Sequence, residues 1–204
     1  MESWKEYLLD WCKYFGFFYK KQIWLNSENS TILILDAIEI YSDLFKTNNI
    51  NAINKLLDDA KLHNIPVVYT NWIRRRNLIN DQINKIGHWS EFVPEQSKIL
   101  HELPKPINTI YTIYTDAFAE SWDKQNNKKI ENQLIHLLGT RKNLIICGSW
   151  TEACVLNTAR SAANKNINPV ILKPGTVGHS SSAKNALISI DKLYGYVTHD
   201  IQFS

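Results

Sequence analysis

The chain has 204 residues, of which 44% are hydrophobic and 21% are charged. This usage is ordinary for a globular protein of one domain, and it excludes a disordered chain or a long coiled coil. Lys and Arg total 23 against 20 Asp and Glu, so the formal net charge is only +3. The single basic run, at residues 74–76, is too short for a nucleic-acid track, and we expect no nucleic-acid partner.

The three cysteines, Cys12, Cys147 and Cys154, are odd in number and show neither disulfide spacing nor zinc-site spacing. They predict free thiols in a reducing compartment. The first residues carry acids and lysines instead of the apolar core of a signal peptide. No apolar run approaches the roughly 18 residues of a membrane span. We therefore expect a cytoplasmic protein with no membrane partner.

An aromatic-rich segment precedes the first expected strand. Trp4, Leu8, Trp11 and Phe15 recur at helical spacing, which predicts an amphipathic helix docked on the body or on a second subunit. Packing is favoured over binding to a membrane surface, because the polar face carries acids as well as lysines. We expect residues 1–30 to be a helical extension and residues 31–204 to be the main domain.

Beyond this segment, apolar runs typical of buried strands alternate with stretches of helical periodicity. Residues 31–35 form a continuous apolar run that ends at Asp36, as expected for a strand buried on both faces. The alternation predicts an α/β fold of three layers, with helices on both faces of a mainly parallel sheet. A long polar segment at 71–106 is typical of a functional loop or lid. The expected strands are 31–35, 66–70, 108–113, 143–147, 169–173 and 196–198, and the expected helices are 51–63, 124–138, 151–164 and 183–193.

Three candidate site residues follow strand ends, where ligands of open α/β sheets bind. Asp36 closes the first strand, Thr112 lies near the end of the third, and Cys154 follows the fourth. Cys154 also falls in the first turn of an expected helix, where unpaired N–H groups and the helix dipole favour a thiolate. Asp36 could be the adjacent base that a nucleophilic cysteine needs. The alternative is that Cys154 is a small buried apolar residue, as free cysteine often is.

The segment 148–155 reads GSWTEACV and is followed by Thr158-Ala159-Arg160. It resembles the nucleophile loop of the isochorismatase-like cysteine hydrolases, whose pattern is roughly G-[VI]-x-T-x-x-C-V with T-x-R a few residues on. The apolar strand closed by Asp36 resembles that family's first motif, and Asp116-Ala117-Phe118 resembles its small-Ala-Phe element. The resemblance extends from about residue 30 to residue 200, and it implies the fold of that family and a tendency to form homo-oligomers.

A Cys–Asp–Lys triad is what the resemblance implies, with Cys154 attacking a carbonyl or nitrile-like carbon and Asp36 transferring the proton. It also implies a cis peptide bond between Trp150 and Thr151, and an oxyanion hole made by the N–H groups of Thr151 and Cys154. Trp150 and Phe118 are candidates for binding a planar substrate, although such side chains more often serve packing. The implied partner is a small-molecule substrate, and no cofactor is implied.

The lysine of that triad is missing, because Thr112 stands four residues before the small-Ala-Phe element. Without that positive charge, an unpaired anion close by disfavours the thiolate and raises the pKa of Asp36. Arg75, another arginine of the run 74–76, or His88 could supply the charge from the long loop, and we include Arg75 among the substrate-binding candidates. We therefore count Thr112 among the catalytic residues, together with Cys154 and Asp36, and expect its hydroxyl to line the pocket.

No metal is expected, because the residues that follow the second strand, 71–74, lack the spacing of Asp and His that a metal site needs. His179 follows the fifth strand and is a further candidate for the border of the pocket. Three functions remain open: a cysteine hydrolase for a small amide, carbamoyl or lactam-type molecule; an Asp36-driven tailoring enzyme of the isochorismatase type; and a non-catalytic binding protein.

Overall fold

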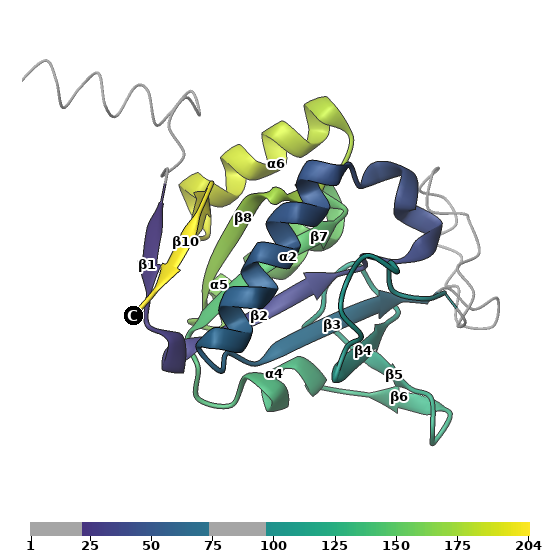
Figure 1. The fold of residues 1–204 in the computed structure, drawn as a ribbon. Coiled ribbons are helices and arrows are strands. Elements are labelled where there is room, and N and C mark those ends of the chain that lie inside the picture. The colour runs from purple at the N-terminus through teal and green to yellow at the C-terminus, as the bar shows by residue number, and fades with distance from the viewer. Residues whose placement is uncertain (1–21, 74–96) are drawn as a thin grey trace, which may run out of the picture.

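Continuous apolar segments form the centre of an eight-stranded sheet in the computed structural model, which describes residues 22–73 and 97–204. The strand order is β6-β5-β4-β3-β2-β7-β8-β9, and neighbours run parallel except at β4–β5 and β5–β6 (Figure 1). This arrangement confirms the expected, mainly parallel α/β sheet. The strands are β2 (Ser30–Leu35), β3 (Val67–Trp72), β4 (Asn108–Thr112), β5 (Ser121–Asp123), β6 (Lys128–Ile130), β7 (Asn143–Ser149), β8 (Asn168–Val177) and β9 (Tyr196–Thr198).

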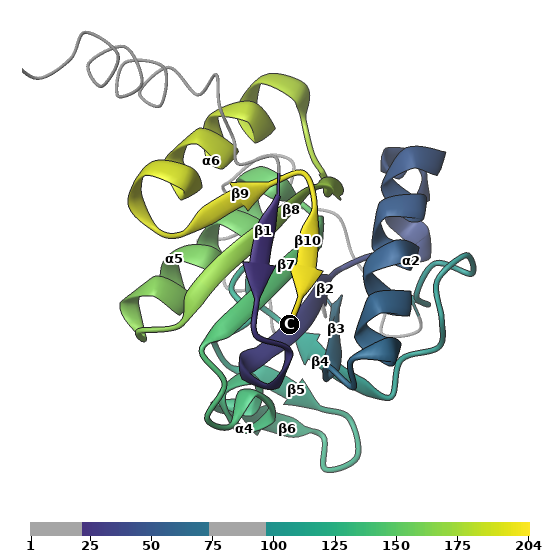
Figure 2. The same cartoon turned by 60° about the vertical axis from the view of Figure 1, so that its left-hand side comes forward.

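Helices cover both faces of the sheet and complete the three layers. On one face lies α2 (Thr47–Leu62), which presents a buried stripe of apolar residues at helical spacing to the sheet. On the other face lie α4 (Gln133–Leu138), α5 (Leu156–Asn164) and α6 (Ser180–Leu193), so that Figure 2 shows α2 apart from α5 and α6. None of the helices in the described ranges is both long and apolar enough to cross a bilayer.

Successive residues of β2 enter two different core clusters, because side chains alternate across a strand. Leu33 and Leu35 face the layer of α4, α5 and α6, whereas Ile32 and Ile34 face α2. All four are at most 1% exposed, which explains why the sequence of this strand is an unbroken apolar run. Cys147 lies within β7, is fully buried and belongs to the α2 side of the core, so it is a packing residue.

The expected helix over 124–138 is wrong in its first half. That stretch contains the turn and the second strand of the β5–β6 hairpin, and α4 begins only at Gln133. Asp123 closes the turn, because its Oδ1 accepts the backbone N–H of both Gln125 and Asn126. Asn127 then adopts a left-handed conformation with φ of 50°, which asparagine tolerates better than most residues. Local side-chain bonding to the backbone thus prevails over helical periodicity here.

The described part of the expected N-terminal extension is a strand and a short 3₁₀ helix, not an α-helix. β1 (Ile23–Leu25) pairs in parallel with β10 (Ile201–Phe203), the last strand of the chain, and η1 (Ser27–Asn29) leads into β2. Leu25, Ile201 and Phe203 join the α2 side of the core, which explains why this small sheet forms. The expected aromatic helix over Trp4 to Phe15 lies outside the described residues.

Candidate active site

Asp36 is fixed at the carboxyl end of β2 by the neighbouring strand β3. Its backbone N–H donates to Oγ1 of Thr70 at 3.0 Å, and the Thr70 hydroxyl donates to Oδ1 of Asp36 at 2.6 Å. The backbone N–H of Trp72 provides a further hydrogen bond to the carboxylate. Asp36 is 1% exposed, so its carboxylate is buried. Its φ of 46° marks the point where the chain turns away from the sheet.

Cys154 lies in a short π-helix, η4 (Thr151–Val155), which joins β7 to α5. The side chain is 3% exposed and belongs to the core cluster on the α5 side. Its thiol makes a hydrogen bond with the carboxylate of Asp36. The structure therefore brings together Asp36 and Cys154, which the sequence predicts at one edge of the sheet because both follow the ends of parallel strands.

Burial dominates the ionisation of this pair. Loss of solvent raises the pKa of Asp36 to about 6, although hydrogen bonds from Thr70, Cys154 and Trp72 act in the opposite direction. Burial and the neighbouring carboxylate raise the pKa of Cys154 well above its ordinary value. At neutral pH the pair is therefore a thiol hydrogen-bonded to a carboxylate.

The thiolate expected from the position of Cys154 at a helix start is thus not the resting state. Hydrogen bonds from the backbone N–H groups of Trp150 and Cys154 itself lower the pKa of the thiol, as a helix start should. Their effect is smaller than that of burial, because a fully enclosed sulfur loses the solvation that a thiolate requires.

Thr112 ends β4, which is separated from β2 by β3. It is the register partner of Trp72, and its carbonyl accepts the backbone N–H of Ile73 at 2.9 Å. The side chain is 3% exposed, and Oγ1 has no hydrogen-bond partner among the described residues. Buried hydroxyls without a partner are few in native proteins, and this one lies at the carboxyl end of a strand, where ligands of open α/β sheets bind.

The loop before Cys154 contains a cis peptide bond, which lies between Ser149 and Trp150. The expected bond between Trp150 and Thr151 is therefore wrong by one residue. The side chains on either side of the observed bond are held by neighbours: the Ser149 hydroxyl donates to the carbonyl of Asp36 at 2.8 Å, and the Trp150 ring meets Tyr41 edge-on at 5.6 Å.

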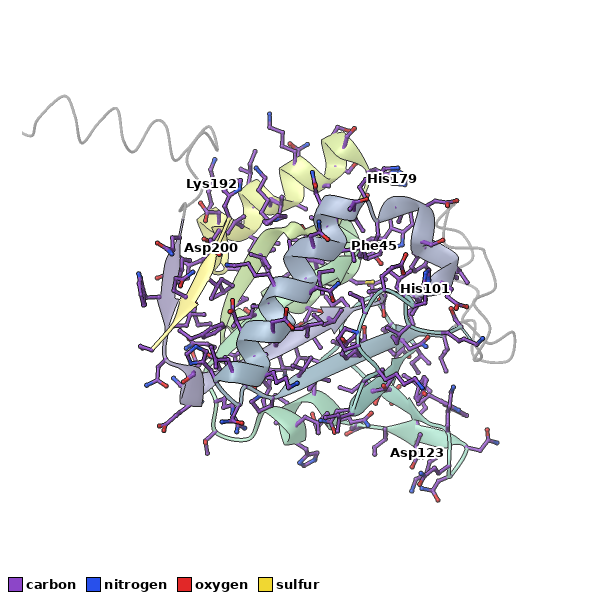
Figure 3. The ribbon with its side chains drawn as sticks, viewed as in Figure 1. Phe45, His101, Asp123, His179, Lys192 and Asp200 are labelled. Carbon is purple, nitrogen blue, oxygen red and sulfur yellow. The ribbon has the colours of Figure 1, made fainter. Side chains whose placement is uncertain are left out.

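Thr151 and His179 connect this loop to the end of β8. The Thr151 side chain is 1% exposed, and its hydroxyl donates to the carbonyl of Val177 at 2.9 Å. The His179 ring lies against Trp150 with a centroid distance of 4.8 Å, and its backbone N–H donates to Oε1 of Glu152 at 2.9 Å. Figure 3 shows His179 where α6 begins, away from Asp123 of the β5–β6 hairpin. His179 thus borders the loop that precedes Cys154.

Phe118 is 7% exposed and packs in the same core cluster as Cys154. The element that contains it is fastened to α5, because the Ala117 N–H donates to Oγ1 of Thr158 at 3.1 Å and Ser161 donates to Asp116 at 2.5 Å. These contacts give the small-Ala-Phe element a clear packing role. Arg75 and His88, the candidate cations of the long loop, lie outside the described residues.

Thr70 is the residue of this site that the sequence reasoning missed. It ends the expected second strand, which neighbours the strand closed by Asp36, and that position was an available signal. Elsewhere at this edge, a cavity of about 520 Å³ borders Thr151 but includes neither Asp36 nor Cys154. Within residues 22–73 and 97–204, His, Cys, Asp and Glu form no group of three that could hold a metal ion.

The model of the Isochorismatase domain matches residues 42–201. No curated protein sequence matches the chain.

Solved structures share the fold at low identity. A cysteine hydrolase from Pseudomonas syringae pv. phaseolicola 1448A is 15% identical with a TM-score of 0.69, covering 85% of this chain and 90% of that one. N-carbamoylsarcosine amidase from Thermoplasma acidophilum is 14% identical with a TM-score of 0.66, and the match covers 83% of this chain and 95% of that one. MAR1 ribonuclease from Caenorhabditis elegans is 16% identical with a TM-score of 0.60, and the match covers 87% of this chain and 80% of that one. Since the model of the Isochorismatase domain spans most of the chain and the fold agrees, this protein belongs to the isochorismatase family.

Proposed function

We propose that this protein hydrolyses a C–N bond in a small amide, carbamoyl or lactam-type molecule, with Cys154 as nucleophile and Asp36 as acid and base. One observation carries the proposal: a buried thiol and a buried carboxylate are hydrogen-bonded to each other at the carboxyl edge of the sheet. A nucleophilic cysteine with an adjacent base is the arrangement that acyl transfer requires. The amidase with the same fold is consistent with this class of reaction.

The steps follow from the resting protonation state. Asp36 takes the thiol proton while sulfur attacks the carbonyl carbon, so the negative charge moves from the carboxylate to the carbonyl oxygen. Asp36 returns that proton to the leaving nitrogen, the C–N bond breaks, and a thioester remains on Cys154. Asp36 then takes a proton from water, hydroxide attacks the thioester, and the C–S bond breaks with return of the proton to sulfur.

The pKa of about 6 suits Asp36 to this work. A group that accepts and returns a proton near neutral pH is most effective when its pKa lies close to the working pH. The N–H groups of Thr151 and Cys154 are our candidates for the oxyanion hole. Those of Ala153 and Val155 are less suitable, because both donate to the carbonyl of Trp150. Trp150, Phe118 and Arg75 remain candidates for substrate binding.

The test is ammonia release from a panel of small amides, ureido compounds and lactams. We expect Cys154→Ala to abolish turnover of any substrate that the wild-type protein hydrolyses. Cys147→Ala is the matched control, because Cys147 is also fully buried but lies on the α2 side of the sheet. Turnover that survives Cys154→Ala and is unchanged in rate would overturn the proposal.

A second candidate function is supported by the burial of Cys154, which is 3% exposed, because burial raises the pKa of the thiol and disfavours the thiolate. A cysteine that stays protonated leaves Asp36 as the main proton-transfer group, as in an isochorismatase-type tailoring reaction. That function predicts an inactive Asp36→Asn variant together with an active Cys154→Ala variant.

A further inference from the structure

The carboxylate of Asp36 is buried without a compensating positive charge in the part of the chain that the structure describes. The groups that influence it there are Thr70, Cys154 and the backbone N–H of Trp72, and all of them are neutral hydrogen-bond donors. The same holds for Cys154, because the one charged group among the described residues that influences it is the carboxylate of Asp36. A buried anion of this kind is costly unless a cation pairs with it.

The hydroxyl oxygen of Thr112 is a second acceptor at this edge of the sheet, and it has no hydrogen-bond partner among the described residues. Thr112 and Trp72 are register partners on adjacent parallel strands, where backbones lie about 4.8 Å apart, and Trp72 donates its backbone N–H to Asp36. Residues that pair in register project to the same face, and Ile110, two positions before Thr112, packs in the cluster that contains Cys154. The unpartnered Oγ1 of Thr112 therefore lies on the face of the sheet that carries the thiol.

We propose that the substrate itself carries a positively charged nitrogen, an ammonium or amidinium group, which binds between the carboxylate of Asp36 and the hydroxyl of Thr112. This inference rests on the proposed hydrolase function and specifies its substrate class. N–H donors of such a group match the two acceptors, since a hydroxyl oxygen accepts through its lone pairs. The positive charge also compensates the buried anion.

Occupancy of this position changes the chemistry of Cys154. A cation close to the thiol favours the thiolate, and it offsets the opposing influence of the Asp36 carboxylate. The nucleophile is therefore activated when a cationic substrate binds, and it stays protonated when the site is empty. A cationic side chain from the long loop would have a different consequence, because the thiol would then be activated without any ligand.

The experiment measures alkylation of Cys154 by iodoacetamide against pH, with peptide mapping to separate it from Cys12 and Cys147. Methylammonium chloride is the probe. Sodium chloride and tetramethylammonium chloride at the same concentration are controls for ionic strength and for charge without N–H donors. We expect methylammonium to raise the rate at pH 7.5 about tenfold, which corresponds to a pKa lower by one. The two control salts should have little effect.

Variants at Thr112 make the test sharper. Thr112→Lys builds a cation into the same place, so Cys154 should react about tenfold faster than in the wild type without any salt and should no longer respond to methylammonium. Thr112→Ser keeps the hydroxyl without adding charge, and it should retain the response. If Thr112→Lys fails to fold, the comparison of salts on the wild-type protein decides by itself.

Two results would contradict the inference. One is a wild-type thiol that titrates below the free value of about 8.5 with no added cation, because the protein would then hold its own positive charge. The other is an unchanged alkylation rate with methylammonium while Thr112→Lys is accelerated. That second result would leave the proposed hydrolase intact, whereas amide turnover that survives Cys154→Ala would remove the hydrolase itself.

Substrate preference gives an independent readout. β-Alaninamide carries an ammonium group and propionamide is the same amide without the amino group, so the pair compares an amide with and without the cationic nitrogen. We expect kcat/KM for β-alaninamide to exceed that for propionamide by at least about tenfold, with the ratio reversed in Thr112→Lys through like-charge repulsion. Equal values in the wild-type protein, or a preference for propionamide, would contradict the inference.

Discussion

Thr70 and Asp36 form a reciprocal pair: the threonine hydroxyl donates to Oδ1 at 2.6 Å, and its oxygen accepts the Asp36 backbone N–H at 3.0 Å. A single side chain on β3 thus fixes both the carboxylate and the backbone at the end of β2. The pair holds the carboxylate in its buried position, so its contribution to stability and to proton transfer can be measured.

Replacing Thr70 with valine removes the donor to the carboxylate. We expect the pKa of Asp36 to rise above 6, because the hydrogen bond from Thr70 lowers it. The acid limb of the kcat/KM profile should therefore move to higher pH, and the free energy of unfolding at pH 8 should fall by about 1.5–3 kcal/mol. Thr31→Val is the control, because the Thr31 hydroxyl is also buried but has no partner among the described residues. An unchanged acid limb would refute the assigned role of Thr70.

Asp36→Asn should stabilise the protein at neutral pH while it removes activity. A carboxyl with a raised pKa in the folded state destabilises that state once it ionises. The cost is absent below pH 3.8, grows up to about pH 6 and is complete above it. The full difference corresponds to about 3 kcal/mol, from which imperfect hydrogen bonding of the amide subtracts. Urea unfolding from pH 4 to pH 8 should show the advantage of the variant growing with pH, and a gap that stays constant would contradict the assigned ionisation.

The Asp36→Asn substitution should also change the pKa of the Cys154 thiol. Removing the Asp36 anion lowers the pKa of Cys154, because that anion is one of the causes that raise it. Alkylation of Cys154 above pH 7 should therefore be faster in Asp36→Asn than in the wild-type protein. Cys147 is the internal reference, since burial alone raises its pKa to about 12. A slower reaction in the variant would show that Asp36 activates the resting thiol.

Gly148 permits the close contact of β7 with β2 that places Asp36 beside the loop that leads to Cys154. A Cβ at this position would lie 1.9 Å from the carbonyl oxygen of Leu35, and φ is +109°. We expect Gly148→Ala to cost about 4 kcal/mol or more. Gly139→Ala is the control, because Gly139 also has a positive φ but has free space around it, and its cost should be about 1–2 kcal/mol. Equal losses in thermal unfolding would contradict this account.

The sequence predicts the sheet and the meeting of Asp36 with Cys154 for the same reason. Apolar runs such as 31–35 specify buried strands, and parallel strands bring their carboxyl ends to one edge. The hairpin at β5–β6 is missed because Asn126 and Asn127, which favour turns, lie within a stretch of helical periodicity. At these two residues, the preference of asparagine for turns predicts the local structure better than helical periodicity does.

Long-range contacts explain the remaining differences. The pairing of Ile23 with Ile201 joins the two ends of the described chain, and no local pattern reports it. The ionisation of Cys154 depends on how completely the core encloses the sulfur, which sequence position at a helix start does not reveal. The unpartnered hydroxyl of Thr112 is likewise a property of packing.

Turnover by Cys154→Ala and Asp36→Asn, measured side by side on one substrate that the wild-type protein hydrolyses, tests the central claim most directly. Our account predicts that both variants lose at least about 10³-fold in kcat/KM, because nucleophile and base act in the same step. An active Cys154→Ala with an inactive Asp36→Asn would instead show acid–base chemistry without a covalent step. Full activity in both variants would contradict the assignment of this site.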